Sequence, residues 1–585
     1  MDKILDTLLA ILEQFEGSPT QKLEPIQQQP NANAVLQEGL GLARAKDYDK
    51  ARLAFDQLLF LAGGWPLAWL LRAETWLNLG HPEQALSDIA RALELDPALS
   101  LAYELRGQAH TLQNQIDLAF QDFSQAMQLD PQRAWSVARR GEWYLKQADF
   151  EKAVADFEQA IRIDPNFAWA FSKRGLAFQK WGKFAESIAS YNRAVEISPE
   201  SVTFLSARGE AYRLMGKFAN AVADFDRALV LAPTDFWARV SRGDAHADAG
   251  ELELAIVDYD QAETLSKDEP YLYSARGEAK RRLGLYDEAL RDLERAITLK
   301  PGYLAAFQRR GETYRNLEEY PRAIADFDQA VQLGDTTTWT RVNRGDAHRM
   351  LENFSAAIAD FRAAIDLDAQ DERAWAGLGK LYRQLGDDSQ ALSNFNEAVW
   401  VAPNQAWLLA LRASLYLAMD DLHYAELDCN AALKLQSTET LALLTRCKLF
   451  QLQKRWAQAL ADAQAALTAD AESDTAAYLL GLSARGSGDE STALQQFQIA
   501  LHLAQTVYDD DPENQFDQAL YRLAGGEDPT ALPSARALLA QLSVPVLREK
   551  ALDLGHYCRL FPMVGAAQAL RQAILAHIHD GTSPA

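Results

Sequence analysis

Residues 206–233 read SARGEAYRLMGKFANAVADFDRALVLAP, and residues 274–301 read SARGEAKRRLGLYDEALRDLERAITLKP. Both stretches contain the same RG dipeptide, later alanines at matching places (Ala221 and Ala228, Ala289 and Ala296), and a closing proline. They start 68 residues apart, which is twice 34. Self-similarity at a fixed spacing is the signature of a repeat architecture, so the same 34-residue period is expected elsewhere in the chain.

The period extends through fourteen consecutive repeats. When the Gly of RG is numbered position 8, that column falls at residues 39, 73, 107, 141, 175, 209, 243, 277, 311, 345, 379, 413, 447 and 481, with no insertion or deletion. The residue is Gly at eleven of these places. Position 20 is Ala in every repeat except at Ser187, and position 27 is Ala in every repeat except at Leu58. Position 24 is usually Phe or Tyr.

These columns predict a pair of helices in each repeat. Positions 4, 8 and 11 share one stripe of a first helix, and positions 20, 24 and 27 share one stripe of a second. Small residues at 8, 20 and 27 let the two backbones approach, and the aromatic ring at 24 fills the space beyond. Gly at position 15, as at Gly216, ends the first helix, and Pro at position 32, as at Pro233, ends the second. Neighbouring pairs must stack, because one pair cannot bury its apolar face alone.

The repeat resembles the tetratricopeptide repeat, which has the same period and the same Gly/Ala–Ala–aromatic–Ala–Pro pattern. The resemblance covers residues 32–507. It implies an all-α fold, a right-handed superhelical α-solenoid of tandem helix-turn-helix repeats with helical caps. The family's Trp at position 4 survives only as Trp69 and Trp375, whereas five other tryptophans stand at position 2.

The two ends of the chain depart from the repeat. Residues 1–31 are expected to form an amphipathic helix over 1–16 followed by a polar linker that contains prolines. Residues 508–585 are expected to hold about four short helices outside the 34-residue register. A cap over the last repeat is the expected role of this C-terminal segment, and a docking or oligomerisation module is the alternative.

An internal ion pair is predicted from two further columns. Position 7 is Arg in eleven repeats and position 23 is Asp in ten, and every repeat with the Asp also has the Arg. Both positions are equally far from the turn at position 15, so the two side chains should face each other across the hairpin. We therefore expect pairs within repeats, such as Arg242 with Asp258, rather than pairing of Asp258 with Arg276 of the next repeat.

The opposite stripe of the first helix, positions 2, 5, 9, 12 and 13, lines the concave groove in the family. We expect its side chains to point away from the packing stripe and to grip an extended peptide through aromatic anchors and charged ladders. The alternative is a set of ordinary surface ion pairs. The candidate binding residues are Trp135, Trp169, Trp237, Trp339 and Trp407 at position 2, Glu210, Glu278, Glu312 and Asp346 at position 9, and Arg213, Arg281, Arg315, Arg349 and Arg383 at position 12.

Composition and missing motifs narrow the function classes. The net charge of −24 disfavours nucleic acid and anionic lipid as partners. No apolar run reaches 18 residues, and the acidic first helix does not resemble a secretory signal, so we expect a cytoplasmic protein without membrane insertion. The three cysteines form no CxxC pair, and no Walker loop, HExxH or GxSxG motif occurs. We therefore expect no catalytic residues, metal or cofactor.

The resulting prediction is a non-catalytic scaffold or adaptor that binds one or more proteins or extended peptides in its groove. Chaperone-tail binders of the family carry Asn at position 9 of a first repeat, and no repeat has Asn there, which argues against that ligand. The rival prediction is a structural subunit that assembles a larger complex or a homo-oligomer through its terminal helices.

Overall fold

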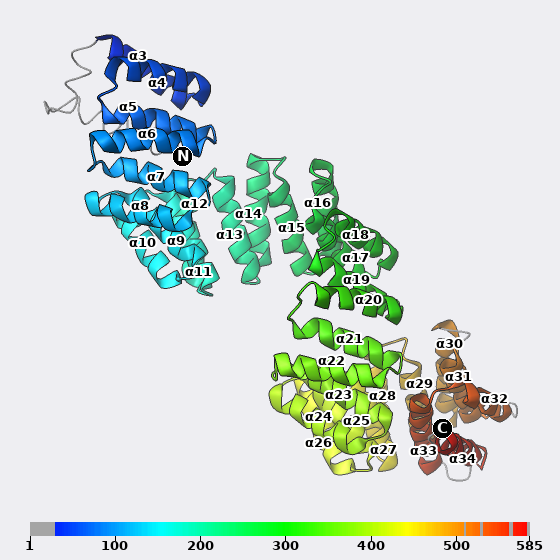
Figure 1. The fold of residues 1–585 in the computed structure, drawn as a ribbon. Coiled ribbons are helices and arrows are strands. Elements are labelled where there is room, and N and C mark those ends of the chain that lie inside the picture. The colour runs from blue at the N-terminus through cyan, green and yellow to red at the C-terminus, as the bar shows by residue number, and fades with distance from the viewer. Residues whose placement is uncertain (1–29, 508–510, 527–530, 561–564, 582–585) are drawn as a thin grey trace. The chain divides into compact units, whose positions relative to one another are not determined.

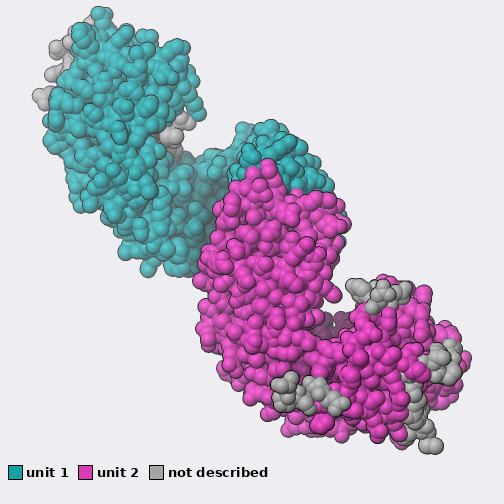
Figure 2. Space-filling model, turned by 45° about the vertical axis from the view of Figure 1, so that its right-hand side comes forward, with its two compact units in different colours: residues 1–283 teal, residues 284–585 magenta. Residues whose placement is uncertain are grey.

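The computed structural model of the chain describes residues 30–507, 511–526, 531–560 and 565–581, and no strand occurs among them (Figure 1). The chain forms two compact units, an N-terminal unit of residues 1–283 and a C-terminal unit of residues 284–585 (Figure 2). The predicted helix over 1–16 and most of its linker lie outside the described residues. None of the described helices is both long and apolar enough to cross a membrane.

The N-terminal unit is a series of helix hairpins. Its helices are α3 (Pro30–Arg44), α4 (Tyr48–Ala62), α5 (Pro66–Asn78), α6 (Pro82–Leu95), α7 (Ser100–Leu112), α8 (Ile116–Leu129), α9 (Ala134–Lys146), α10 (Phe150–Ile163), α11 (Ala168–Lys180), α12 (Phe184–Ile197), α13 (Val202–Leu214), α14 (Phe218–Leu231), α15 (Phe236–Asp248), α16 (Leu252–Leu265) and α17 (Pro270–Arg282). Odd-numbered helices are the first helices of the predicted repeats and even-numbered helices the second.

The C-terminal unit continues the series and adds the C-terminal segment. Its helices are α18 (Tyr286–Leu299), α19 (Leu304–Asn316), α20 (Tyr320–Gln332), α21 (Thr338–Met350), α22 (Phe354–Leu367), α23 (Glu372–Leu385), α24 (Asp388–Val401), α25 (Ala406–Ala418), α26 (Leu422–Leu435), α27 (Thr440–Leu452), α28 (Trp456–Ala469), α29 (Asp474–Ser487), α30 (Glu490–Val507), α31 (Pro512–Gly525), α32 (Ala531–Leu538), the 3₁₀ turn η1 (Leu539–Gln541), α33 (Val544–Leu560) and α34 (Gly565–Gly581). The tandem helix hairpins confirm the predicted all-α solenoid fold.

Position 15 reverses the chain in every repeat by adopting a left-handed conformation. Seven of these residues are glycines, and the other seven carry a side chain yet have φ between 57° and 65°: Lys46, Asn114, Ala148, Glu318, Glu352, Asp420 and Lys454. A side chain in this conformation costs roughly 1–2 kcal/mol. The predicted glycine stop is therefore a property of the position, and the fold imposes it even where no glycine is present.

The core of each hairpin is formed by the predicted small and aromatic columns. In the seventh hairpin, a Cβ added at Gly243 would lie 2.8 Å from the ring of Tyr259, so the ring packs directly on the glycine backbone. Where position 8 is larger than Gly, position 24 lacks an aromatic ring, as in Ala73 with Ile89 and Cys447 with Ala463. The two columns share one fixed volume, as close packing requires.

The predicted Arg–Asp ion pair forms within the repeats. In nine of the ten pairs the Arg and the Asp belong to the same compact unit, and in all nine the Arg Nη2 donates to the Asp Oδ1 at 2.5–2.9 Å. The nine carboxylates are buried. The hydrogen bond to the Asp is the main cause that raises the pKa of each of these arginines above its usual value.

The same arginines also connect adjacent repeats, a contact that the sequence columns did not predict. The Nη1 of Arg242 lies 2.6 Å from Asp226, which is position 25 of the preceding repeat. Arg276 makes the equivalent contact with Asp260 at 2.7 Å, and Arg208 reaches Asn192 at 2.9 Å. The Arg242 guanidinium thus donates two hydrogen bonds within its own hairpin and a third to the preceding hairpin.

The C-terminal segment contains four α-helices within its described residues, as expected, although two of them have 17 residues and are not short. Helix α31 packs on α30, and Tyr521 lies 4.9 Å from Tyr478 of α29, measured between ring centroids. Phe516, Leu547 and Tyr557 are buried in the same core as the last hairpin. Helix α33 also contacts α23 and α27, which are first helices of the repeat series.

Candidate peptide-binding surface

Positions 2, 5, 9, 12 and 13 of successive first helices lie side by side within each compact unit, and we name this surface the first-helix face. In the N-terminal unit α9, α11, α13 and α15 each contact the next first helix. Side chains on the face or directly beside it bridge these helices: Lys173, at position 6, lies 2.9 Å from Glu142, and Tyr271 donates to Asp244 at 2.7 Å. These repeats therefore present one connected polar and aromatic surface.

Four of the five candidate tryptophans are partly buried against neighbouring repeats. Trp135 stacks on Phe167 at 5.4 Å and lies 5.1 Å from Trp169. Trp339 meets Phe327 edge-on at 6.0 Å, and Trp407 packs beside Ala376. The expectation that position 2 points away from the packing stripe is wrong for these four, because position 2 begins the first helix where it meets the preceding hairpin.

Trp237 is the exception, with 55 % of its surface exposed. Its ring lies 6.4 Å from that of Tyr271, the residue at position 2 of the next repeat. Asp244 accepts hydrogen bonds from Tyr271 and Tyr259 at 2.7 Å each, and burial raises the pKa of Asp244 above its usual value. We name Trp237, Tyr271, Asp244, Arg213 and Asp248 the α15 patch.

The four predicted acid–arginine pairs all form along their first helices. Arg213 holds Glu210 through two hydrogen bonds of 2.8 Å. The N–O distance is 3.8 Å between Arg315 and Glu312, and 3.2 Å between Arg349 and Asp346. Arg213 also pairs with Asp248 of the next first helix. Through this second contact Arg213 connects two adjacent first helices, which a pair within one helix would not do.

Arg281, at position 12 of the eighth repeat, is the least exposed of the paired arginines on the face. Only 14 % of the Arg281 side chain is exposed, and its Nε and Nη2 donate to Glu278 at 2.9 Å and 2.7 Å. Arg281 is therefore largely covered, although its partner Glu278 lies on the same first-helix face. The physical reason is that the long side chain lies along α17 while the carboxylate three residues earlier holds its guanidinium in place.

Arg383 differs from the other candidate arginines, because position 9 of its repeat is Lys380 and not an acid. The Nη1 of Arg383 donates to Ser414 at 2.8 Å. Burial lowers the pKa of Lys380 below its usual value. The charge of Asp346 opposes this shift, and the charges of Arg349 and Arg315 add to it. Position 9 thus changes from an acid in repeats 6–10 to a lysine in repeat 11.

Sequence reasoning missed two residues of the face, Tyr271 and Asp248, and the neighbouring Lys173 at position 6. Tyr271 stands in the same position-2 column as the tryptophans, so a search for any aromatic residue there would have found it. Lys173 and Asp248 contact face residues of an adjacent repeat. Such contacts leave no mark within a single repeat and were therefore not visible in the aligned columns.

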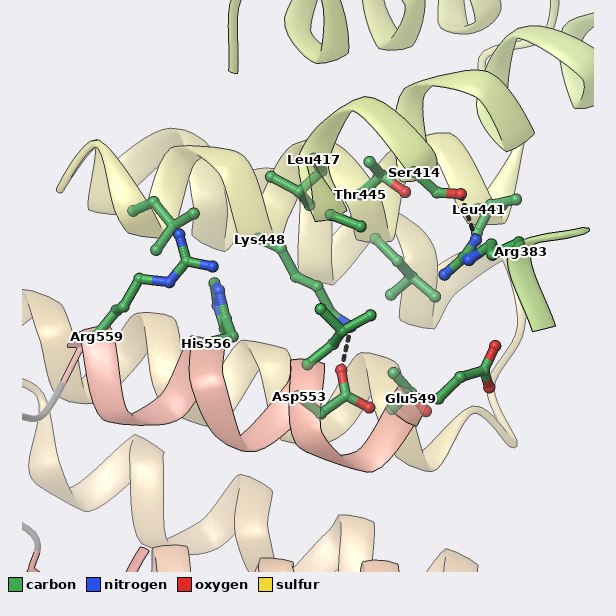
Figure 3. Close-up of a pocket in the computed structure, with 15 residues that line it drawn as sticks. Arg383, Ser414, Leu417, Leu441, Thr445, Lys448, Glu549, Asp553, His556 and Arg559 are labelled. Atoms are coloured by element: carbon green, nitrogen blue, oxygen red, sulfur yellow. Dashed lines mark hydrogen bonds and ion pairs between the residues drawn. The ribbon is translucent and has the colours of Figure 1, made fainter. Parts of the chain in front are cut away.

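The first-helix face of the last repeats is covered by α33 (Figure 3). Lys448 at position 9 lies 2.7 Å from Asp553, and Gln451 at position 12 lies 2.6 Å from His556. At the two ends of the contact, Arg548 donates to the Gln384 carbonyl at 2.9 Å and Arg559 pairs with Asp420 at 2.6 Å.

A cavity of about 260 Å³ remains between α33 and the face. Leu417, Leu441 and Leu444 of the face line it together with Leu552 of α33. The helix is therefore held mainly by polar contacts on this side, with its apolar contact incomplete.

Burial and the nearby Lys448 charge lower the pKa of His556 to about 3, so the imidazole is neutral at physiological pH. Gln451 uses its amide nitrogen to donate to Leu479 and Ser483 at 2.8 Å each. Its oxygen then accepts from His556, which fixes the proton of the ring on Nε2. This histidine thus has a packing role.

In the described ranges no three His, Cys, Asp or Glu side chains converge to hold a metal ion. Burial raises the pKa of Cys429 and Cys447 to about 12, so both thiols stay protonated and unreactive.

Comparison with known families identifies the repeats. Models described as TPR repeat match residues 141–182 and 180–216, and models described as tetratricopeptide repeat match residues 77–134, 202–235, 274–336 and 342–406. Comparison with curated proteins gives no match.

Solved structures similar to this chain include the APC/C hetero-tetramer Cut9–Hcn1, at 15% identity over 78% of this chain and 98% of that chain with a TM-score of 0.40. Yeast Tom70 is 16% identical over 76% of this chain and 96% of that chain, also with a TM-score of 0.40. A thermophilic TPR protein in Thermus thermophilus is 22% identical over 31% of this chain and 98% of that chain, with a TM-score of 0.28.

Proposed function

The chain belongs to the tetratricopeptide-repeat proteins, whose repeats are protein-interaction modules, and we propose that it is a non-catalytic scaffold that binds a polypeptide partner on its first-helix face. We also propose that it acts in the cytoplasm, with an N-terminal segment of residues 1–31, a repeat array of residues 32–507 and a C-terminal segment of residues 508–585.

The observation that carries this proposal is the α15 patch. A tryptophan with more than half its surface in solvent costs solubility and contributes little to packing, whereas Trp and Arg dominate the energetics of protein interfaces. Trp237 stands beside Tyr271, the hydroxyl of Tyr271 donates to Asp244, and Arg213 and Asp248 form an ion pair toward the other end of α15. An apolar anchor site with a charged rim is the usual anatomy of a binding hot spot.

The half-buried candidates shape the surface next to the patch. Arg139 lies 4.7 Å from the ring centroid of Trp135 and 5.0 Å from that of Trp169, so the three side chains stiffen one another. In the C-terminal unit, Trp339, Trp407 and Arg383 belong to the first-helix face of that unit.

The acid–arginine pairs contribute charge and specificity, since rim charges act mainly on association rate and on partner choice. These pairs are Glu278 with Arg281, Glu312 with Arg315, and Asp346 with Arg349. Because Glu278 already holds Arg281, the net charge of this pair matters more than a direct bond from Arg281 to the partner. Arg281→Glu makes the rim more acidic and should therefore change the salt dependence of binding.

The test compares two exposed tryptophans. The partner is captured from native lysate with the full-length protein, and its affinity is then measured for the wild type, Trp237→Ala and Trp400→Ala. Trp400 is strongly exposed on α24, a second helix, and is therefore a matched control outside the face. Loss of a buried anchor typically costs about 2 kcal/mol or more, so Trp237→Ala should weaken binding about thirtyfold.

Thermal melts of the same proteins decide between anchor and packing. The proposal expects both variants to melt close to the wild type and only Trp237→Ala to lose affinity. A strongly lowered melting temperature for Trp237→Ala with unchanged affinity per folded molecule would show that this tryptophan is structural.

A further inference from the structure

Helix α33 gives an internal example of how a polypeptide lies on the first-helix face. Its residues toward the face are Glu549, Leu552, Asp553, His556 and Arg559, which recur at intervals of three and four. This is the single-stripe spacing by which an amphipathic helix docks in a groove. The stripe meets positions 9 and 12 of repeat 12 and positions 2, 5 and 9 of repeat 13, which are positions that form the face elsewhere in the chain.

The span of this contact fits a helix and not an extended chain. Arg548 contacts Gln384 of repeat 11 and Arg559 contacts Asp420 of repeat 12, while His556 between them contacts Gln451 of repeat 13. Eleven residue steps of helix rise about 16 Å, whereas the same steps of extended chain cover about 36–40 Å. Three neighbouring repeats thus contribute contact residues to one helix of this length.

The open face around α15 offers the same positions with different side chains. Position 2 holds Trp237 and Tyr271 there, but Leu441 and Thr475 beneath α33, where a cavity remains. Position 9 holds an acid in each of repeats 6–8, whereas it holds Lys448 beneath α33. A helix on the open face would therefore rest on two rings in place of a cavity and would meet carboxylates where α33 meets a lysine.

We propose that the partner of the α15 patch is a basic amphipathic helix, seated as α33 is seated on repeats 11–13 but with the charge at its centre reversed. This inference rests on the proposed function and names the partner's chemistry. Glu210 and Glu278 already hold Arg213 and Arg281, so the selection rests on net charge: at positions 9, 12 and 13 of repeats 6–8 four carboxylates (Glu210, Asp244, Asp248 and Glu278) outnumber three arginines (Arg213, Arg281 and Arg282). This excess of negative charge favours lysine or arginine on the helix, and Trp237 and Tyr271 receive its apolar stripe.

The probe is a fluorescently labelled synthetic peptide with the sequence of residues 544–560 carrying Glu549→Lys and Asp553→Lys. Three peptides control for it: the unchanged sequence, the charge-reversed sequence with Leu552→Pro, and a scrambled form of the charge-reversed sequence. Binding to the full-length protein is measured at physiological salt, where weak non-specific attraction to an acidic protein is screened. The Leu552→Pro peptide keeps the charge but cannot form a continuous helix.

The charge-reversed peptide is expected to bind at least tenfold more tightly than each of the three controls. Trp237→Ala in the protein should weaken this binding at least tenfold, and Trp400→Ala should leave it unchanged. Equal binding of the Leu552→Pro peptide would show that the site takes an extended chain, and the inference would be wrong. Absence of binding, or binding that does not respond to Trp237→Ala, would overturn it as well.

The outcome for the helix is separable from the outcome for the proposed function. If the partner captured from lysate depends on Trp237 but none of the peptides does, the scaffold function stands and the helical, basic partner is refuted. If neither the partner nor the peptides depend on Trp237, both proposals fail.

Discussion

Replacing Arg242 by alanine is expected to destabilise the seventh hairpin, α15 and α16, by about 2–3 kcal/mol. The guanidinium donates to Asp258 at 2.9 Å and 2.5 Å, and that carboxylate is only 3 % exposed. Removing one member of a fully buried pair costs roughly 3–5 kcal/mol, because the remaining charge stays in a low-dielectric site. The Arg242 side chain is 23 % exposed, so water relieves part of this cost and the lower value follows.

The second contact of the same arginine should be much weaker. Asp226 is 53 % exposed, and exposed pairs contribute about 0.2–1 kcal/mol. Two double-mutant cycles separate the contacts, one with Arg242→Ala and Asp258→Ala and the other with Arg242→Ala and Asp226→Ala. The first should give a coupling above about 1 kcal/mol, and the second should stay below that value.

Hydrogen exchange of the amides in α15 and α16 is the appropriate measurement. A long repeat array does not unfold in one step, so a single global melting curve would average over many hairpins. A first coupling near zero, together with clear coupling between Asp258 and Arg276 of the next repeat, would refute the assignment of the pair to its own hairpin.

Three further predictions concern packing, backbone and pH. Ala255→Leu, at a fully buried position 20, should cost about 1–3 kcal/mol by overpacking, and no change in local hydrogen exchange would contradict the packing of α15 on α16. Ala148→Gly should stabilise the fourth hairpin by roughly 0.5–1 kcal/mol, because φ is 59° there, while the same change at Asn114, which tolerates this conformation, should matter less. His556 has a pKa of about 3 in the folded state, which is below its unfolded value of about 6.5. The unfolded state therefore takes up the proton first, and the stabilisation present near pH 7 is lost as the pH falls below about 6.5. Relative to His556→Gln, the wild type should lose about 2 kcal/mol of hydrogen-exchange protection in α33 between pH 7 and 5. The comparison with His556→Gln is needed because burial raises the pKa of Asp517 to about 6, which acts in the opposite direction and cancels in the difference.

Much of the fold could be predicted from the sequence because the same helix-packing contacts recur at the same positions of each repeat. The Gly243–Tyr259 contact and the Arg242–Asp258 pair join positions of one repeat, so the repeats record them in register. The bond from Arg242 to Asp226 joins two repeats and uses Asp, Asn or Glu at position 25, so the chemistry of that column varies and hides the contact.

The candidate site could be predicted only in part. Helical spacing places Trp237 and Trp169 at the same position, yet Trp169 is packed against Phe157 and Phe167 while Trp237 is exposed. The difference depends on the residues of the preceding hairpin, which a single column does not contain. The contact of α33 with the first-helix face could not be predicted, because Asp553 and Lys448 are 105 residues apart and α33 belongs to no repeat.

The central claim is that the first-helix face binds the partner, and site-specific photo-cross-linking tests it most directly. A photoreactive phenylalanine analogue is placed at Trp237 or at Val257, which is exposed on the second helix α16 of the same repeat. The account predicts that the captured partner cross-links at position 237 and not at position 257. Cross-linking at position 257 with none at position 237 would place the partner on the other side of the hairpin and contradict the account.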